Sequence, residues 1–502
     1  MTTTPDARDE LITDELTAER LRKLDDARAA GVDPYPAHVD RSHTAAEAHA
    51  LYAALEADGQ TEPPEVAVAG RLLSIRPHGK LTFATIQDGS GPIQLAFKRD
   101  TVGADRYAFF QQTFDRADFI SARGPLFRTR MGELTVEVRE FAMLAKALRP
   151  LPEKWHGLQD TEARYRQRYL DILTNPDSRA VFLRRTAIVS AMRRYLDGQG
   201  FLEVETPVLQ PLYGGAAARP FETYYNALER TFFLRISDEL YLKRLIVGGL
   251  DKVYEIGRDF RNEGVDTTHN PEFTMMECYW AYADYRDIMA LVENMTAYIA
   301  QQVMGTTRIT YQGHDIELAP PWQRVSLRDG ILAESGIDID EHTTFEALRD
   351  AIRAQGVKIN PKPTWGQLVN ELLDACLQPT LIQPTFVIDY PTEISPLAKK
   401  KPDAPQLTER FEFFIATKEM GNAFSELNDP LDQRERFVQQ AAMRAAGDEE
   451  TMPLDEDYIL ALMHGMPPTA GLGVGIDRLT MLLADRPSIR EVILFPQLRT
   501  LK

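Results

Sequence analysis

The sequence contains very few cysteines, and this scarcity excludes several kinds of site. Cys278 and Cys376 are the only two among 502 residues. Two thiols alone cannot complete a four-ligand zinc cluster, and they do not resemble the disulfide framework of a small secreted protein. The sequence also lacks a Ser-His-Asp or Cys-His arrangement that would indicate a covalent nucleophile. Any catalysis is therefore expected to depend on positioning and charge.

Long apolar runs are absent as well. No run approaches the roughly 18 residues that a membrane-spanning helix needs, so we expect no membrane contact. The first ten residues, MTTTPDARDE, are polar and acidic, which argues against a signal peptide. Hydrophobic residues make up 44% and charged residues 26% of the chain, as in ordinary folded proteins. The simplest expectation is a folded cytoplasmic protein with two or three domains.

Basic residues are outnumbered by acidic ones. The chain has 57 Lys and Arg against 75 Asp and Glu, for a formal net charge of −18. This balance argues against nucleic-acid binding, because phosphate contacts need a basic surface. Residues 66–132 are an exception, since they hold ten Lys and Arg and only five Asp and Glu.

The N-terminal third is expected to hold a helix and a small barrel. Residues 15–30 carry Leu16, Leu21, Leu24 and Ala27 at helical spacing. Four or five short alternating segments then follow within about 80 residues, separated by turn signals. This pattern predicts a β-barrel such as an OB-fold. We therefore predict a helical extension at 1–60, an OB-fold at 61–148 and a linker at 149–165.

The remaining residues, 166–502, are predicted to form one large domain that mixes strands and helices. A long amphipathic helix is predicted over about 178–197, where Leu183 and Ile188 belong to the apolar face. Residues 320–376 are mostly helical in pattern and read as an insertion. The fold class predicted for the whole chain is α+β.

Residues 252–282 have the pattern of two antiparallel strands around a polar loop. Arg261 could offer a planar fork to a phosphate, and Phe273 could offer an apolar platform to an adenine ring. A solvated face with ordinary ion pairs is the alternative, at roughly even odds.

Acidic residues are dense beside apolar ones at 409–429, where Glu412, Glu419 and Glu426 stand among Phe and Ile. Carboxylates in an apolar frame are costly unless they meet metal ions or a cationic substrate. An exposed strand edge protected by acids is the alternative.

Glycines 471, 473 and 475 predict a strand with one bare face, which lets a ligand or another strand approach closely. A helix that starts near Ile476 would place Arg478 in its first turn, where the helix dipole and a guanidinium both favour phosphate. The alternative is tight packing alone. Residues 201–210 predict an edge strand that ends at Pro207 and could form a dimer surface, although core packing is the default.

These segments resemble motifs 1, 2 and 3 of the class II aminoacyl-tRNA synthetases, and in detail the bacterial-type lysyl-tRNA synthetase family. The resemblance covers nearly the whole chain. The stretches that carry it are RYRQRYLDIL (164–173), GGAAARPF (214–221), ELYLKRL (239–245), FRNEG (260–264), HNPEFTMME (269–277), YAD (282–284), SPLA (395–398), RFEFF (410–414), FSELND (424–429) and PPTAGLGVGIDR (467–478).

The resemblance implies an antiparallel catalytic sheet flanked by helices, an anticodon-binding OB-fold and a homodimer. It implies ATP-dependent ligation of L-lysine to tRNA(Lys) through a lysyl-adenylate, with release of AMP and pyrophosphate. Arg261 and Arg478 match the catalytic cations, and Glu412 and Glu419 match ligands of Mg²⁺. The matching ATP contacts are Glu263, His269, Asn270, Phe273, Glu412 and Arg478. The matching lysine contacts are Gly215, Glu239, Arg261, Glu277, Tyr279, Asn422 and Glu426. The matching anticodon contacts are Arg76, Phe83, Gln94 and Glu133.

Some positions depart from the family pattern. Cys278 replaces Leu, Ala423 replaces Gly, and Tyr224-Tyr225 replaces a His pair. We expect these residues beside the active site without replacing a contact residue. In the barrel, Ile75 and His78 interrupt a stretch that is more basic in the family.

Three other functions share part of this pattern. An aspartyl- or asparaginyl-tRNA synthetase has the same architecture, but an aspartate pocket needs a cation where Glu239 and Glu426 stand. Two carboxylates instead suit an ammonium ion, and Tyr279 could add a hydrogen bond. A protein-lysylating paralogue lacks the barrel. A non-catalytic OB-fold protein would not need Arg261, Glu412, Glu419 and Arg478.

Overall fold

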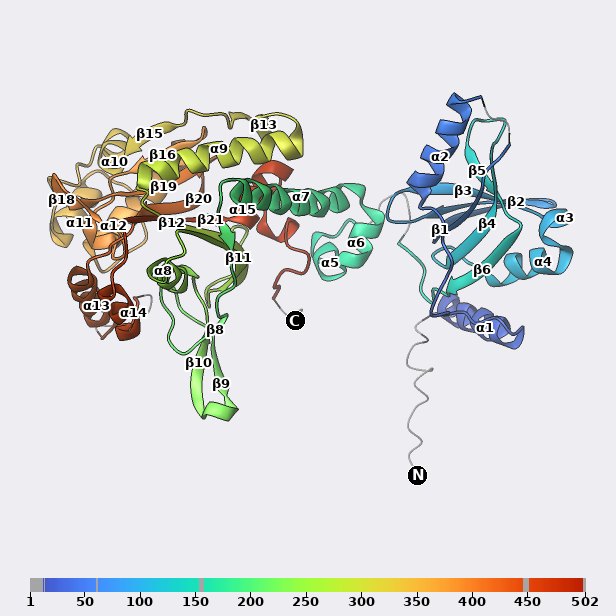
Figure 1. Cartoon of the computed structure of the whole chain (residues 1–502), viewed down its shortest axis with the longest axis horizontal. Helices are drawn as coiled ribbons and strands as arrows, with labels where there is room; N and C mark the ends of the chain where they lie inside the picture. Colours follow the sequence, from blue (N-terminus) through green and yellow to red (C-terminus); the bar gives the residue numbers. More distant parts are fainter. Residues whose placement is uncertain (1–11, 13, 60–61, 153–157, 446–450, 500–502) are drawn as a thin grey trace. The chain divides into compact units, whose positions relative to one another are not determined.

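The computed structural model describes residues 12, 14–59, 62–152, 158–445 and 451–499 (Figure 1). The chain divides into two compact units, Met1–Gly157 and Leu158–Lys502, and each is considered by itself. The polar first ten residues and positions 153–157 of the expected linker lie outside the described residues. The narrower domain limits expected from the sequence remain predictions.

The first unit contains a closed barrel of six strands, one or two more than the alternating segments indicated. Its strands are β1 (Glu65–His78), β2 (Leu81–Gln87), β3 (Pro92–Lys98), β4 (Phe119–Arg128), β5 (Leu134–Glu137) and β6 (Glu140–Ala145). They pair in the order β1-β2-β3-β5-β4-β6, and an additional β1–β4 pairing closes the sheet. The apolar face of the last segment is confirmed, because Leu134, Val136 and Val138 are all buried.

Four helices accompany the barrel within the described part of this unit. They are α1 (Glu15–Ala29), α2 (Ala45–Ala57), α3 (Arg99–Val102) and α4 (Ala104–Thr113). The predicted helix at 15–30 is confirmed as α1, and the Asp14 side chain caps it by accepting a hydrogen bond from the Thr17 N–H. Leu21, Leu24 and Ala27 are buried as expected. Leu16, in the first turn of α1, is 42% exposed instead.

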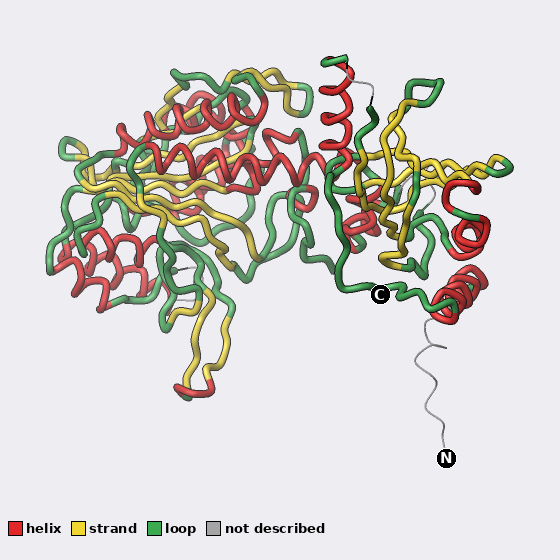
Figure 2. The backbone as a smooth tube through the Cα atoms, turned by 45° about the vertical axis from the view of Figure 1, so that its right-hand side comes forward, coloured by secondary structure: helices red, strands yellow, loops and turns green. Residues whose placement is uncertain are grey.

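The second unit is built on an eight-stranded sheet, and its strands run between layers of helices (Figure 2). The strand order is β15-β16-β19-β20-β21-β12-β11-β7. The strands are β15 (Gln323–Ser326), β16 (Thr385–Ile388), β19 (Arg410–Ile415), β20 (Lys418–Ser425), β21 (Thr469–Gly475), β12 (Glu272–Ala281), β11 (Lys252–Phe260) and β7 (Leu202–Glu203). The inner pairs are antiparallel, as expected for this class, whereas the two edge pairs β15–β16 and β7–β11 are parallel.

Helices cover both faces of this sheet (Figure 1). On one face lie α7 (Pro176–Gly198), α9 (Tyr285–Met304) and α15 (Ile476–Ala484), and on the other lie α8 (Glu239–Val247), α13 (Pro430–Ala445) and α14 (Glu456–Met463). Side chains alternate between the faces, so Met276 and Cys278 of β12 join the α7–α9–α15 core. Met275, Glu277 and Tyr279 point toward the opposite face, which is hollowed by a cavity.

The remaining predicted elements are partly confirmed. Helix α7 begins at Pro176, but Leu183 is 61% exposed rather than part of the core. The expected strand at 201–210 is found at the sheet edge as β7, but it ends at Glu203 rather than at Pro207, and the short strand β8 (Leu209–Gln210) follows. β8 pairs with β10 (Arg230–Leu234), which pairs with β9 (Glu222–Tyr225).

The expected insertion at 320–376 begins with the edge strand β15 and continues as helices. These are α10 (Leu327–Ser335), α11 (Phe345–Ala354), α12 (Trp365–Leu372) and the π-helical turn η3 (Leu373–Leu377). They bury a separate apolar cluster that includes Leu348 and Leu372. The remaining strands are two hairpins, β13 (Arg308–Tyr311) with β14 (His314–Glu317) and β17 (Lys400–Lys401) with β18 (Ala404–Thr408).

Candidate active site

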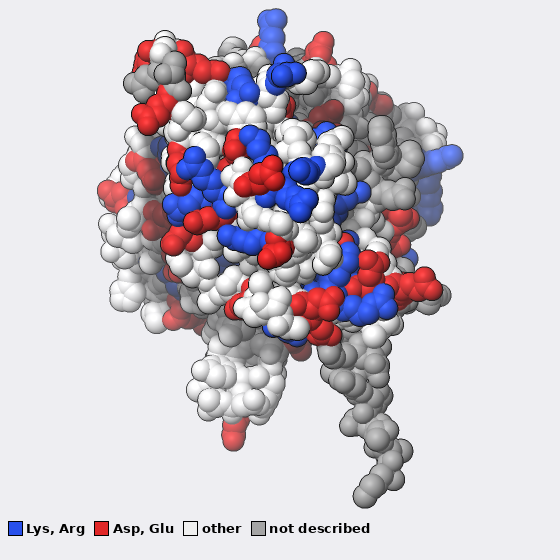
Figure 3. Space-filling model, turned by 90° about the vertical axis from the view of Figure 1, so that its right-hand side faces the viewer, with Lys and Arg blue, Asp and Glu red and all other residues white. Residues whose placement is uncertain are grey.

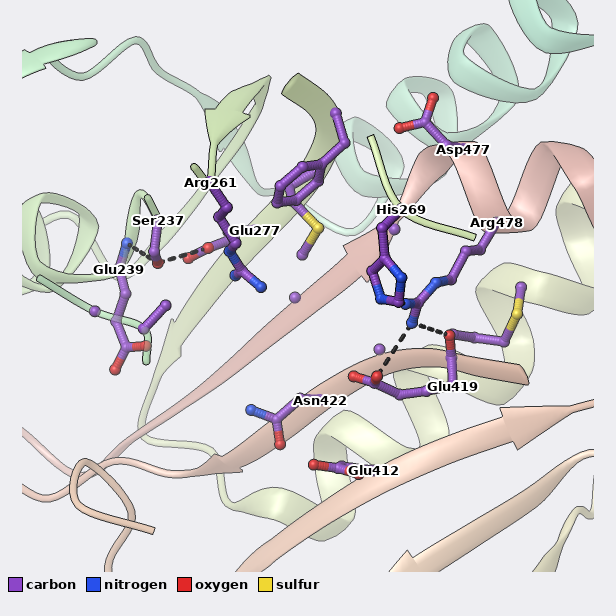
Figure 4. A pocket seen from close by; sticks show the side chains of 18 of the residues that line it. Ser237, Glu239, Arg261, His269, Glu277, Glu412, Glu419, Asn422, Asp477 and Arg478 are labelled. Atoms are coloured by element: carbon purple, nitrogen blue, oxygen red, sulfur yellow. Dashed lines mark hydrogen bonds and ion pairs between the residues drawn. The ribbon is translucent and has the colours of Figure 1, made fainter. Parts of the chain in front are cut away.

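A cavity of about 460 Å³ opens over the centre of the eight-stranded sheet. It brings together three segments that are far apart in the sequence: the β11–β12 hairpin, the β19–β20 hairpin and the β21–α15 junction. The predicted site residues that line it are Gly215, Glu239, Arg261, Glu263, His269, Asn270, Phe273, Glu277, Tyr279, Glu412, Glu419, Asn422 and Arg478. Figure 4 shows Ser237, Glu239 and Glu277 at one end and His269, Glu419 and Arg478 at the other.

Hydrogen bonds hold Glu277 at the closed end of the cavity. Its carboxylate accepts hydrogen bonds from the Ser237 hydroxyl at 2.8 Å and from the Tyr279 hydroxyl at 3.0 Å. Burial raises the pKa of Glu277, although these two donors act in the opposite direction. The Glu277 carboxylate is therefore held in one orientation, as a hydrogen-bond acceptor that lines the cavity.

The two acids expected to hold a substrate ammonium, Glu239 and Glu426, are already ion-paired with a lysine of the protein. Lys243 Nζ lies 2.5 Å from Glu239 Oε1 and also contacts the Glu426 carboxylate. Glu239 lines the cavity, but Glu426 is 1% exposed and lies behind the lining residues. Burial raises the pKa of Glu239 to about 7 and also raises the pKa of Glu426, whereas Lys243 lowers both.

Glycine at position 471 leaves room for this group. A Cβ atom built there would lie 2.2 Å from Glu426 Oε1 and 2.5 Å from Cε1 of the Tyr279 ring. Real Cβ atoms do not approach so closely, so a side chain would push both groups aside. The bare face predicted for this strand is therefore used by side chains of neighbouring strands.

Arg261 and Phe273 contact each other where they line the cavity. Arg261 follows β11, and its guanidinium carbon lies 5.0 Å from the centre of the Phe273 ring. The Arg261 Nε donates a hydrogen bond to the Ile236 carbonyl at 3.4 Å. This arrangement combines a flat apolar surface with a planar cation, as an adenine and a phosphate would require.

Arg478 reaches the same space from the first turn of α15. Its Nη1 donates hydrogen bonds to the Glu419 carbonyl at 2.7 Å and to Glu419 Oε2 at 3.1 Å (Figure 4). His269 Nε2 lies 3.4 Å from Nη2 of the same guanidinium. Burial acts to raise the pKa of Glu419, but Arg478, together with Arg261 and Arg410, outweighs burial and lowers that pKa.

The start of α15 is itself anchored by Asp477. Its carboxylate is paired with Arg185 of α7 at 2.5 Å and accepts the Thr274 N–H of β12 at 2.8 Å. These contacts join α15, α7 and β12, so they hold the backbone that carries Arg478. Asp477 is therefore a supporting residue that was not expected from the sequence.

Glu412 and Glu419 stand on neighbouring strands and both line the cavity. Glu412 accepts hydrogen bonds from Arg410 at 2.6 Å and from the Tyr390 hydroxyl at 2.9 Å, and burial raises its pKa to about 7. Among the described residues, no group of three or more His, Cys, Asp or Glu side chains is arranged to hold a metal. Two carboxylates fit Mg²⁺, which usually takes one or two protein carboxylates together with phosphates and water.

Comparisons with known proteins agree with this geometry. The family profile of tRNA synthetases class II (D, K and N) matches residues 160–499, and that of the OB-fold nucleic acid binding domain matches residues 66–144. The lysine–tRNA ligase of Chloroflexus aurantiacus is 56% identical over 97% of this chain and 98% of its own length. That of Bacillus subtilis is 51% identical over 98% of both chains.

The chain belongs to the lysine–tRNA ligase family of class II tRNA synthetases.

The three departures at Cys278, Ala423 and Tyr224-Tyr225 do not line the cavity. Cys278 and Ala423 are fully buried in the α7–α9–α15 core, because both occupy positions that point to that face of the sheet. Tyr224 and Tyr225 are 59% and 47% exposed on β9 and do not line the cavity. Cys278 and Ala423 thus adjoin lining residues on their strands, but their own side chains point to the other face of the sheet and replace no lining residue.

The predicted anticodon residues share one face of the barrel. Arg76 pairs in register with Phe83 across β1 and β2, and Gln94 of β3 pairs with Thr85 and Thr135. Phe83 is half-buried rather than part of the barrel core, and Glu133 immediately precedes β5. The Thr135 hydroxyl donates to Gln94 Oε1 at 2.9 Å, which fixes the orientation of that amide. By strand register these positions lie on one face, where Phe127 pairs with Thr135 and the His78 ring contacts the Phe83 ring.

The basic excess of the barrel is partly neutralised by local ion pairs. Lys98 pairs with Glu137 at 2.6 Å, and Arg128 pairs with Glu56 at 2.7 Å. Figure 3 looks onto this unit and shows Lys and Arg side chains mixed with Asp and Glu. A sequence count therefore overstates the free positive charge of this surface.

Besides Asp477, three residues that contact the predicted acids were not predicted from the sequence: Ser237 and Arg410, which line the cavity, and Lys243, which is buried behind it. Arg410 donates to Glu412 and, at 2.9 Å, to the Asn422 side-chain oxygen, so it connects the two predicted groups. Each of the three acts on an acid that was predicted. Only the one-turn spacing of Glu239 and Lys243 on a helix could have indicated one of these contacts in advance.

Proposed function

We propose that this ligase joins lysine to tRNA in two steps that both occur in the cavity between Gly215 and Arg478. ATP-dependent ligation of lysine to tRNA is the activity of its family. The closed, acidic end of the cavity would hold the substrate, and the end with Arg261 and Arg478 would hold ATP. The carboxylate cluster of Glu239, Glu277 and Glu426 is the observation that supports lysine over the other amino acids.

In the first step the lysine carboxylate attacks the α-phosphorus of ATP and expels pyrophosphate. That carboxylate is already ionised at neutral pH, so no general base is needed. Arg261 would hold the α-phosphate while Phe273 supports the adenine, and Arg478 would neutralise the leaving pyrophosphate. Glu263, His269 and Asn270, from the loop between β11 and β12, would complete the ATP contacts.

Glu412 and Glu419 would hold Mg²⁺ when ATP is bound. The ion would supply positive charge that stabilises the phosphates. The hydrogen bonds from Arg410 and Tyr390 orient the Glu412 carboxylate, and the contact with Arg478 keeps Glu419 ionised. These contacts support two fixed oxygen ligands facing the phosphate end of the cavity.

In the second step the terminal ribose hydroxyl of tRNA attacks the lysyl carbonyl, and AMP leaves. Recognition of tRNA(Lys) would depend on the barrel, where the Phe83 ring stacks on an unpaired base while Arg76, Gln94 and Glu133 contact base edges. The face shared by these residues supports this role.

We further propose a cytoplasmic homodimer. Among the described residues no helix is long and apolar enough to cross a bilayer. Exposed apolar side chains concentrate around α7 and the β7 edge, which supports pairing of two copies there. Examples are Leu183, Leu202, Val208 and Leu209, each at least 40% exposed.

A screen of all twenty amino acids for ATP–pyrophosphate exchange tests the substrate assignment. Lysine is expected to support rapid exchange, with Mg²⁺ required, and purified tRNA(Lys) is then expected to become charged. Faster exchange with aspartate or asparagine, or none with lysine, would overturn it.

A further inference from the structure

Lys243 is an unusual residue for the floor of a pocket that binds a cation. Its side chain has no exposed surface and lies between the Phe424 and Tyr458 rings, at 5.4 and 6.0 Å from their centres. It pairs with both Glu239 and Glu426. The resident ammonium therefore occupies a position next to the place where a substrate ammonium would bind.

Charged and titratable groups reach this cluster from helices α8 and α14, strands β11, β12 and β19, and the segments next to them. Arg244 follows Lys243 on α8 but pairs with Asp455 and Asp457, outside the cavity. Tyr458 of α14 faces Lys243, and its buried hydroxyl has no hydrogen-bond partner among the residues that the structure describes. Other charged or titratable groups interact electrostatically with the three acids. They are Glu277 and Tyr279 of β12, Arg410 of β19, Arg261, and the group of Arg235, Asp238 and Asp259 that lies next to Glu277.

The charges at the closed end do not cancel. Glu239, Glu277 and Glu426 provide three carboxylates, and Lys243 provides one ammonium. With all four groups ionised, the pocket keeps an excess of two negative charges. Free lysine carries two ammonium groups, and its carboxylate would face Arg261. A diamino acid therefore balances the pocket, whereas an amino acid with a neutral side chain leaves one buried charge unpaired.

We propose that Lys243 is a specificity-determining, positioning residue that sets the charge of the pocket to match a diamino acid. Its ammonium holds Glu239 and Glu426 together and leaves two negative charges for the substrate. This inference rests on the proposed lysine pocket and adds a residue that acts through the acids rather than on the substrate.

Removal of the charge is expected to change proton exchange on binding. In the Lys243→Met variant, two facing carboxylates lose their shared cation, so one of them takes up a proton. Lysine must then displace that proton. We expect calorimetry in two buffers of different ionisation enthalpy to show about one more proton released per site than in the wild-type enzyme. The lysine KM should rise about tenfold for each unit by which that carboxyl pKa exceeds the pH, while the ATP KM stays within about twofold.

Three further variants test whether the lost charge of Lys243 causes the extra proton release. Lys243→Arg keeps the charge and should release the wild-type number of protons. The double variant Glu239→Gln with Lys243→Met removes one charge of each sign and should also return to that number, even if Lys243→Met alone fails to fold. Arg434→Met is the matched control, because it removes an exposed cation that pairs with Glu456 at the surface, whereas Arg244 stacks on the Tyr458 ring at 5.4 Å.

The proposal is overturned if Lys243→Met raises the lysine KM but releases the wild-type number of protons on lysine binding. It is also overturned if the double variant releases a different number of protons from the wild-type enzyme. An incorrect lysine pocket gives a different pattern. In that case neither Lys243→Met nor Glu426→Gln changes the lysine KM, although both proteins are folded.

Discussion

Substitution of Glu426 by Gln tests the proposed lysine pocket with the smallest change of shape. The Glu426 side chain is buried, is paired with Lys243 and lies against Gly471. Gln keeps the volume but removes one negative charge and turns one acceptor into a donor. Lys243 retains Glu239 as its partner, so the fold is expected to persist while the pocket becomes less acidic.

The expected loss follows from one charge-assisted hydrogen bond. Such a bond contributes about 1.5–3 kcal/mol, which corresponds to a loss of roughly 10- to 150-fold in kcat/KM for lysine. Lysine-dependent ATP–pyrophosphate exchange measures this loss, and the KM for ATP should change little. Glu435→Gln is a matched control, because Glu435 is exposed on α13. Unchanged kcat and KM for lysine in Glu426→Gln would refute the reasoning.

Four other predictions concern separate parts of the molecule. Phe83→Ala should reduce tRNA charging by roughly 5- to 150-fold, since stacking contributes about 1–3 kcal/mol per base, while exchange stays intact; equal loss of both would indicate misfolding. Gly471→Ala should raise the lysine KM and lower the melting temperature, because its Cβ would collide with Glu426; wild-type values would contradict the close packing. The lysine KM should fall as the pH rises from 6 to 8, because the raised pKa of Glu239, about 7, leaves that acid partly protonated and unable to pair with an ammonium at the lower pH; a flat profile would contradict this. Leu183→Asp should shift the protein toward monomer in sedimentation, and an unchanged mass would exclude this surface.

The local structure of the strands and helices was largely predictable from the sequence. The alternation at 252–282 and 409–429 led to antiparallel pairs, and the helix after the glycine run begins at Ile476 as expected. These elements follow from short-range patterns of burial and backbone freedom. The acids of β19 and β20, which could have marked an exposed edge, instead lie on interior strands.

The predicted residues also came together in space, although their roles remain predictions. Strand parity placed Phe273, Glu277 and Tyr279 on one face, and that face lines the cavity. The same parity shows why Cys278 does not line the cavity, since its side chain points into the core on the opposite face of the sheet. The family resemblance supplied residue types at fixed positions, but it did not indicate which face each departure would occupy.

The sequence by itself determined the family, the barrel, the order of the elements and the set of chemically active side chains, because these depend on local patterns and long matching motifs. Only the tertiary structure decided the electrostatic partners. Lys243 neutralises acids from two segments, Arg410 joins Asn422 to Glu412, and Asp477 anchors the helix that carries Arg478. Such contacts join residues up to several hundred positions apart, and their distances and burial set the charge that a substrate meets.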